Sequence, residues 1–259
     1  MTSEPRTARG ASALGPRLRV GIVQLDPGVP SCRLDAWLDG AGASIRLARL
    51  DLGDPVPECE AMIVLGGRMN AYSENTWPAV AAGLRLLDDC LRVQRPVLAI
   101  CLGHQLLARV GGGHVALGAL DPPEGGAQLI DWAPAARSDP VLAGTLGVLD
   151  AAEEQPPAAT SWVAQSHYDL VDELPAGSVP LASSARCAVQ SFRIGPALGV
   201  QFHPEADPEL IAHWARGHGP GARAKEESSV RVRDAQIAAL GRSLLSSYVA
   251  SCQALLDQR

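Results

Sequence analysis

The sequence predicts an α/β fold: an open, mostly parallel sheet with helices on both faces, antiparallel additions in the second half and a C-terminal helical extension. From Leu18 to Gly113, short apolar runs alternate with amphipathic helical patterns. After Gly113 the apolar runs are shorter and are separated by Pro and Gly, and a long helical stripe occupies 228–256. Alternation of strand and helix at this spacing is typical of a parallel sheet covered by helices.

The composition excludes several classes of protein. The chain has 259 residues and a net charge of −6, without a Lys/Arg-rich run, so we expect no nucleic-acid partner. No apolar run approaches the ~20 residues of a membrane span, so we expect no membrane association. The six cysteines show no C-x-x-C spacing, which argues against a disulfide framework and a metal site. We therefore expect a reduced, cytoplasmic protein.

The first half contains strands and helices in alternation. Pro78 suits the first turn of a helix, where no backbone N–H is required, and Val80, Leu84, Leu87 and Leu91 follow it at helical spacing. We expect strands over 18–25, 44–50, 61–65 and 96–100, and helices over 32–41 and 78–94.

The second half has shorter apolar runs, which Pro and Gly separate. Asp207-Pro208-Glu209 is a helix start signal, which predicts a helix over 206–216, a break over 217–221 and a long helix over 228–256. We expect β-type runs at 113–117, 126–132, 146–149, 160–165, 178–182, 187–193 and 197–202. The predicted organisation is a disordered tail over 1–16, a main domain over 17–218, and a linker with an amphipathic helix over 219–259. That helix docks on its own domain or forms a homodimer contact; the sequence leaves both open.

A candidate nucleophile stands at the corner between a strand and a helix. The stretch from Pro96 to Ala108 reads PVLAICLGHQLLA, with Cys101 between the apolar run and the helical pattern. A sharp strand-to-helix turn exposes the residue at its corner at a helix N-terminus, whose partial positive charge favours a thiolate. Ala99 and Gly103 are small enough for such a turn.

A second stretch supplies a candidate base. Ala197 to Glu205 reads ALGVQFHPE, in which His203 follows an apolar strand and Pro204 ends it. Residues i and i+2 lie on the same side of a strand, so Glu205 can orient the His203 ring. Enzymes of this architecture place their sites at the carboxyl ends of the strands. Cys101, His203 and Glu205 therefore form a candidate triad.

Together, AICLGHQ and VQFHPE resemble the class I glutamine amidotransferase family, and in particular stand-alone proteins similar to the glutaminase part of GMP synthetase. The resemblance covers roughly Leu18 to Gly217 and implies the flavodoxin-like fold of that family. It implies that Cys101 attacks the side-chain amide of glutamine, giving a γ-glutamyl thioester and ammonia. His203 would transfer the proton and Glu205 would orient His203. No cofactor is implied.

The resemblance also implies an oxyanion hole and a substrate-binding set. Backbone N–H groups of Leu102 and of the Gly66-Gly67 turn would hold the oxyanion. Substrate contacts would come from Gln105 and from the segment similar to the family's S-H-G-D, which here reads Ser166, His167, Tyr168 and Asp169.

Three positions depart from the family pattern. Ala99 and Tyr168 replace glycines, and Arg68 replaces the proline that often follows the Gly-Gly pair. Tyr168 would reshape the substrate pocket. The histidines outside these motifs, His114, His213 and His218, are interpreted as structural.

These observations leave three hypotheses. The first is a glutamine amidotransferase that passes ammonia to a synthetase on another chain, since 259 residues leave little room for a synthetase domain. The second, motivated by Tyr168 and the C-terminal extension, is a stand-alone hydrolase or transferase acting on another γ-glutamyl amide. The third is a non-catalytic regulatory protein on the same fold, against which the intact triad argues.

Overall fold

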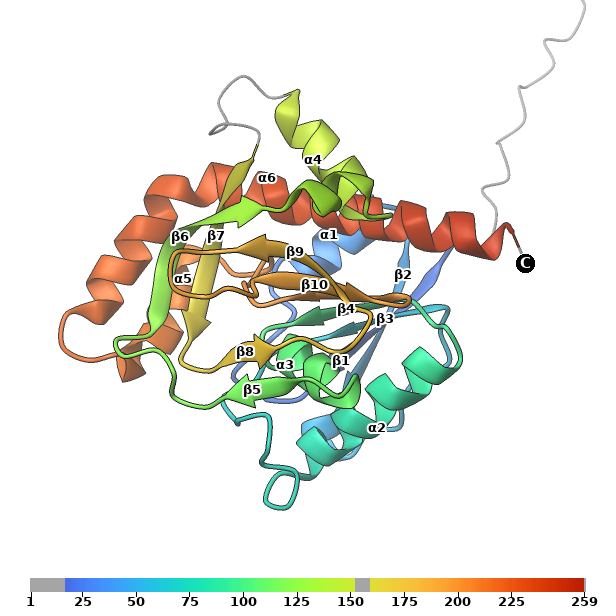
Figure 1. Cartoon of the computed structure of the whole chain (residues 1–259), viewed down its shortest axis with the longest axis horizontal. Helices are drawn as coiled ribbons and strands as arrows, with labels where there is room; N and C mark the ends of the chain where they lie inside the picture. The colour runs from blue at the N-terminus through green and yellow to red at the C-terminus, as the bar shows by residue number, and fades with distance from the viewer. Residues whose placement is uncertain (1–16, 152–158, 259) are drawn as a thin grey trace, which may run out of the picture.

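The computed structural model describes residues 17–151 and 159–258. The predicted disordered tail, 1–16, lies outside the described residues. A single large sheet dominates the described chain, with a small two-stranded sheet beside it (Figure 1). Among the described residues, no helix combines the length and apolar character needed to cross a bilayer.

The large sheet has nine strands in the order β2-β1-β3-β4-β11-β10-β9-β6-β7. The first five are parallel and the remaining pairings are antiparallel, which confirms the predicted fold class. The strand bounds are β1 Arg19–Gln24, β2 Ser44–Arg49, β3 Ala61–Val64, β4 Val97–Ile100, β6 Glu124–Trp132, β7 Thr160–His167, β9 Val179–Ser183, β10 Ser191–Ile194 and β11 Ala197–Val200. The small sheet pairs β5 (His114–Ala116) with β8 (Leu170–Glu173).

Helices cover both faces of the large sheet (Figure 1). Ile63 and Ile100 share one hydrophobic cluster with α1, α4 and α6, whereas Val64 and Ala99 share another with α2 and α3. Neighbouring strand residues face opposite layers, so these strands are buried on both sides. The helix bounds are α1 Leu34–Gly40, α2 Pro78–Arg92, α3 Leu102–Val110, α4 Leu142–Asp150, α5 Pro208–Trp214 and α6 Ala222–Leu256, with short 3₁₀ segments at Leu50–Leu52 (η1), Pro134–Ser138 (η2) and Ala215–Gly217 (η3).

Helix α6 is the longest helix of the described chain and lies along one side of the sheet (Figure 1). It begins at Ala222, earlier than the predicted start at 228. Leu240 and Leu244 enter the core, and the buried Tyr248 hydroxyl donates to the Met62 carbonyl at 2.7 Å. The apolar face of α6 is therefore covered by its own chain. The predicted homodimer and the division of the chain at 218 stay predictions.

One expected β-type run is wrong. Residues 146–149 lie in helix α4. The Asp139 carboxylate accepts from the backbone N–H groups of Val141 and Leu142 at 2.9 and 3.0 Å, which stabilises the first turn of that helix. Arg193 holds the same carboxylate with two bonds of 2.7 Å. A short apolar run alone does not distinguish strand from helix.

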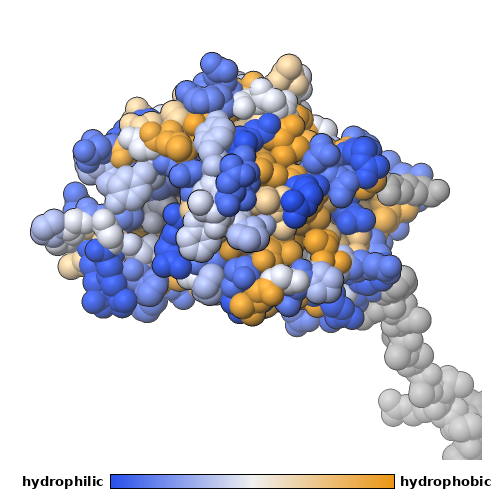
Figure 2. Space-filling model, turned by 90° about the horizontal axis from the view of Figure 1, so that it is seen from below, coloured by the Kyte–Doolittle hydropathy of each residue, from blue (hydrophilic) through white to orange (hydrophobic). Residues whose placement is uncertain are grey.

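Figure 2 shows the molecule from below, the side on which α2 lies in Figure 1; hydrophilic and hydrophobic residues are mixed on this surface. Trp77 and Val93, at the two ends of α2, are exposed. Single exposed apolar residues of this kind are ordinary on protein surfaces and do not indicate a binding site.

Candidate active site

The corner at Cys101 is a strained turn. Strand β4 ends at Ile100, Cys101 has φ +51° and ψ −109°, and helix α3 begins at Leu102. Few non-glycine residues adopt a positive φ, and those that do gather at functional sites. Only 6% of Cys101 is exposed, and the side chain lines a cavity.

Two glycines allow the corner to pack against β3. A Cβ on Gly103 would lie 2.5 Å from the Val64 carbonyl oxygen. A Cβ on Gly66 would lie 3.2 Å from His203 Cε1 and 3.3 Å from Cys101 Cβ. The absence of side chains at these positions lets the loop after β3, the corner at Cys101 and the His203 ring approach one another.

We expect Gly103→Ala to lower kcat at least about tenfold, because the first turn of α3 must move away from β3 and shifts Cys101 with it. Gly147→Ala is the matched control, because Gly147 also lies in a helix but has open space around its Cβ position. Steady-state kinetics and thermal unfolding of both variants check this. Unchanged kcat in Gly103→Ala would contradict it.

His203 and Glu205 form a buried pair beside Cys101. His203 Nδ1 donates to Glu205 Oε1 at 2.7 Å, and the residues are 2% and 0% exposed. The His203 ring packs against Trp214 with centroids 4.5 Å apart, and the His203 amide donates to the Ala164 carbonyl at 2.9 Å. These contacts fix the ring with its Nδ1 toward Glu205.

The charges around His203 favour its protonated form. Burial by itself lowers the pKa of the imidazole, but the Glu205 carboxylate, and the negative charge and hydrogen bond of Cys101, outweigh it and raise the pKa to about 10. A protonated imidazole beside a cysteine stabilises the thiolate. The arrangement therefore suits nucleophilic attack by sulfur followed by proton transfer from nitrogen.

The loop after β3 is anchored by a buried carboxylate. Asp26, which is 2% exposed, accepts from the Arg68 backbone N–H at 2.9 Å and from the Arg68 guanidinium at 2.8 and 2.9 Å. Gly67 lines the cavity beside Cys101. Arg68 thus holds the loop by an ion pair with Asp26.

The predicted substrate segment lies across the cavity from the corner. Gln105 Nε2 donates to the Asp169 carbonyl and to Gln201 Oε1, both at 3.2 Å. The same Asp169 carbonyl accepts from His167 Nδ1 at 2.9 Å, and His167 Nε2 donates to the buried Glu124 carboxylate at 2.9 Å. Gln105 and His167 therefore fix the backbone of this segment from two sides.

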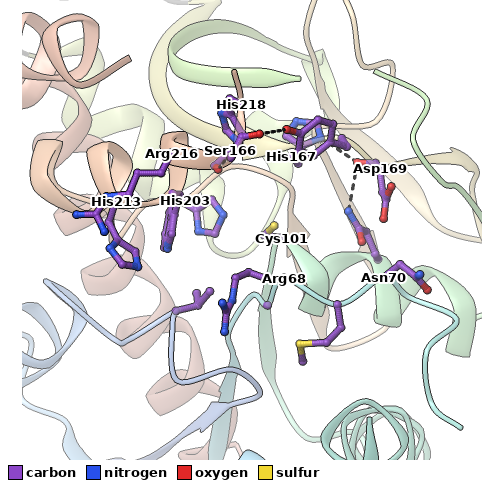
Figure 3. A pocket seen from close by; sticks show the side chains of 17 residues that line it. Arg68, Asn70, Cys101, Ser166, His167, Asp169, His203, His213, Arg216 and His218 are labelled. Carbon is purple, nitrogen blue, oxygen red and sulfur yellow. Dashed lines mark hydrogen bonds between the residues drawn. The ribbon is translucent and has the colours of Figure 1, made fainter. Parts of the chain in front are cut away.

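These residues surround one cavity of about 570 Å³ (Figure 3). Cys101, Gln105, His203, Gly67 and the segment 166–169 line it, whereas Gly66, Leu102 and Glu205 lie behind its surface. Sequence reasoning missed the remaining wall, which is formed by Val29, Arg68, Met69, Asn70, His213, Trp214, Arg216, Gly217 and His218. Among the described residues, no three His, Cys, Asp or Glu side chains converge to hold a metal ion.

Comparison with known proteins identifies the family. The model of the family "Glutamine amidotransferase class-I" matches residues 43–213. The glutamine-hydrolysing GMP synthase subunit of Methanopyrus kandleri is 34% identical over 188 residues, which cover 68% of this chain and 86% of that protein. Gamma-glutamyl peptidase 3 of Arabidopsis thaliana is 30% identical over 156 residues, or 59% of this chain and 57% of that one.

The same comparison extends to solved structures. A glutamine amidotransferase from Thermotoga maritima superposes with a TM-score of 0.73 and 24% identity, over 90% of this chain and 99% of that chain; this likeness concerns the fold. The family match and the 34% identical relative confirm the predicted family and an enzyme of the amidotransferase type. The chain belongs to the class I glutamine amidotransferases.

Proposed function

We propose that this protein hydrolyses the side-chain amide of L-glutamine, with Cys101 as nucleophile, His203 as proton carrier and Glu205 as the group that orients His203. The observation that carries the proposal is the meeting of Cys101 with the His203–Glu205 pair at the ends of the adjacent strands β4 and β11. The relatives named as glutamine-hydrolysing GMP synthase subunits support the same substrate.

In the proposed reaction, the Cys101 thiolate attacks the amide carbon and forms a C–S bond. Backbone N–H groups of Leu102 and Gly67 stabilise the oxyanion. His203 donates its proton to the leaving nitrogen, the C–N bond breaks, and ammonia departs from a γ-glutamyl thioester. His203 then takes a proton from water, hydroxide attacks the thioester carbon, and the C–S bond breaks. This restores the Cys101 thiolate beside protonated His203, and the new carboxyl group releases its proton to solvent as glutamate leaves.

We further propose that the ammonia passes to a synthetase on another chain. The name of the Methanopyrus kandleri relative describes one subunit of a synthase, which supports a division of labour between chains. We also propose that the protein works in the cytoplasm.

The test combines product analysis with thiol labelling. Purified protein is incubated with L-glutamine, and ammonia and glutamate are expected in equal amounts. A chloroketone analogue of glutamine should label Cys101 and not Cys32, since burial and the Asp207 carboxylate raise the pKa of Cys32 to about 11 and keep it a thiol. L-Glutamine should protect Cys101. Absence of both ammonia release and labelling would refute the proposal.

A second candidate function is cleavage of a γ-glutamyl amide with an anionic leaving amine. In Figure 3, His213 and Arg216 lie on the His203 side of Cys101, whereas Asn70 and Asp169 lie on the other side. Because His203 would protonate the leaving nitrogen, this is the side of the leaving group. Arg216 has no ion-pair partner within 17–151 and 159–258. A cavity of about 570 Å³ falls in the range of pockets for drug-sized ligands.

If this second function holds, Arg216→Gln should lower kcat/KM for γ-glutamylglycine roughly tenfold, because a charge-assisted hydrogen bond to the glycine carboxylate is lost. The uncharged γ-glutamyl methylamide should be cleaved as before. Arg92→Gln, on the exposed end of α2, is the control variant. Equal kcat/KM for γ-glutamylglycine in Arg216→Gln and wild type would exclude an anion site at Arg216.

A further inference from the structure

A third buried histidine–carboxylate pair, besides His203–Glu205 and His167–Glu124, lies in the wall of the cavity. His218 Nδ1 donates to both oxygens of Glu226, at 2.9 and 3.0 Å, and the side chains are 6% and 11% exposed. The other ring nitrogen, Nε2, lies 3.4 Å from Ser166 Oγ (Figure 3). The proposed reaction makes no use of this pair, and both residues lie beyond the family match at 43–213.

Two glycines of strand β6 allow the start of helix α6 to pack closely against that strand. A Cβ on Gly125 would collide with the Glu226 carboxylate, and a Cβ on Gly126 would collide with Ser229 Oγ. Ser229 Oγ also accepts from the Ala127 backbone N–H at 2.9 Å. Strand β6 pairs with β7, and the register places Gly125 opposite Ser166. Glu226 is therefore fixed directly behind the substrate segment.

The segment before α6 is held to the same region. The Tyr168 hydroxyl donates to the Gly217 carbonyl at 3.2 Å, and the Tyr168 and His218 rings meet edge to face with centroids 5.4 Å apart. Tyr168, the residue that departs from the family pattern, thus contacts the segment that carries His218. Tyr168 and the part of the cavity wall formed by Gly217 and His218 are therefore in direct contact.

The Glu226 carboxylate can only accept, so His218 Nδ1 carries a hydrogen. In the neutral tautomer that we assign to His218, Nε2 is then an acceptor for the Ser166 hydroxyl. The lone pairs of Ser166 Oγ then face the rest of the cavity. No Arg or Lys side chain within the described residues pairs with Glu226, so beside a neutral His218 its negative charge is not neutralised. An acceptor oxygen beside a carboxylate suits a cationic ammonium group.

We propose that His218 and Glu226 are positioning residues that orient Ser166 as the acceptor for the α-ammonium group of the γ-glutamyl substrate. This inference rests on the proposed function, because it concerns the same site. Helix α6 then takes part in substrate selection, and the enzyme requires amides with a free α-amino group.

The test measures binding without turnover, in the Cys101→Ala background, so that it does not depend on catalysis. Glu226→Gln removes the charge and keeps the shape beside Gly125. We expect it to raise the Kd of L-glutamine about tenfold or more, since a hydrogen bond to a charged group is weakened. The Kd of Nα-acetyl-L-glutamine, which lacks the ammonium group, should stay within twofold. Calorimetric titration measures both.

The control variant is Glu227→Gln, because Glu227 pairs with Arg231 on the outer side of the same helix. It should bind both ligands as the parent does. His218→Ala removes the acceptor from the other side of Ser166 and should show the same selective loss. In the active enzyme, Glu226→Gln should raise KM for L-glutamine while kcat changes less than about threefold.

The outcomes separate this inference from the proposed function. Equal weakening of both ligands, unchanged L-glutamine binding in Glu226→Gln, or no L-glutamine binding in the parent would overturn the role of His218 and Glu226. Selective L-glutamine binding without ammonia release by the wild-type enzyme would support that role and refute the proposed hydrolysis instead.

Discussion

Cys101→Ala should reduce glutamine hydrolysis by about 10⁴-fold or more, because no thioester can form and the remaining groups only bind and polarise the amide. L-Glutamine binding should persist, since the alanine methyl occupies the place of the Cys101 Cβ. Ammonia release measured over hours gives the residual rate, and calorimetry gives the Kd.

Cys32→Ala is an unusually close control for this experiment. Cys32 and Cys101 both have a positive φ, 48° and 51°, so each substitution places alanine at a positive φ. Cys32→Ala should keep wild-type kcat. If both variants lost activity, the cause would be the strained backbone and not the missing thiol. If Cys101→Ala kept its activity, Cys101 would not be the nucleophile.

Glu205→Gln should lower kcat by roughly 10²–10⁴-fold and leave KM nearly unchanged. The carboxylate fixes Nδ1–H of His203 at 2.7 Å and stabilises the imidazolium, and an amide does neither reliably. Stopped assays of kcat and KM measure the loss. Glu209→Gln, which breaks an exposed ion pair with Arg231, is the control and should be neutral. A comparable fall in both variants would contradict a specific role of Glu205.

Glu205→Gln should also change how the free energy of unfolding depends on pH. The folded protein holds the His203 proton up to a pKa of about 10, above its ordinary value of 6.5, so folding is stabilised by this proton below pH 6.5 and loses that stabilisation as pH rises through about 10. Glu205→Gln should therefore be most destabilised relative to wild type near pH 6, and the difference should shrink toward pH 10. Urea unfolding at several pH values measures it.

The local parts of the site could be predicted from sequence because short patterns determine them. The apolar run before Cys101 and the small Gly103 specify a tight strand-to-helix corner. The apolar run 197–200 forms β11, and His203 meets Glu205 in the turn that follows it. The predicted pairing of these two residues is present, although the strand ends at Val200 and not at Pro204. Their meeting with Cys101 depends on β11 lying next to β4, which no local pattern specifies; the resemblance to a family supplied it.

The rest of the cavity wall could not be predicted because its contacts join distant residues without periodicity. His213 and His218 were interpreted as structural, yet both line the cavity. Nothing near His218 in the sequence indicates that Glu226 binds its Nδ1 or that Ser166 lies at its Nε2. The helical start at Leu142 was missed for a similar reason, because Arg193 from another strand holds the capping Asp139.

The pairing of β11 with β4 also sets the order in which the enzyme can assemble. Ala197 lies opposite Val97 and Val200 opposite Ile100, so the middle of the sheet is completed by a part of the chain that leaves the ribosome long after Cys101 does. Joining such distant strands costs loop-closure entropy and makes folding slow. Until β11 is synthesised, Cys101 lacks the neighbour that we propose as its proton carrier, His203. If the proposed function holds, a nascent chain cannot hydrolyse glutamine before the sheet is complete.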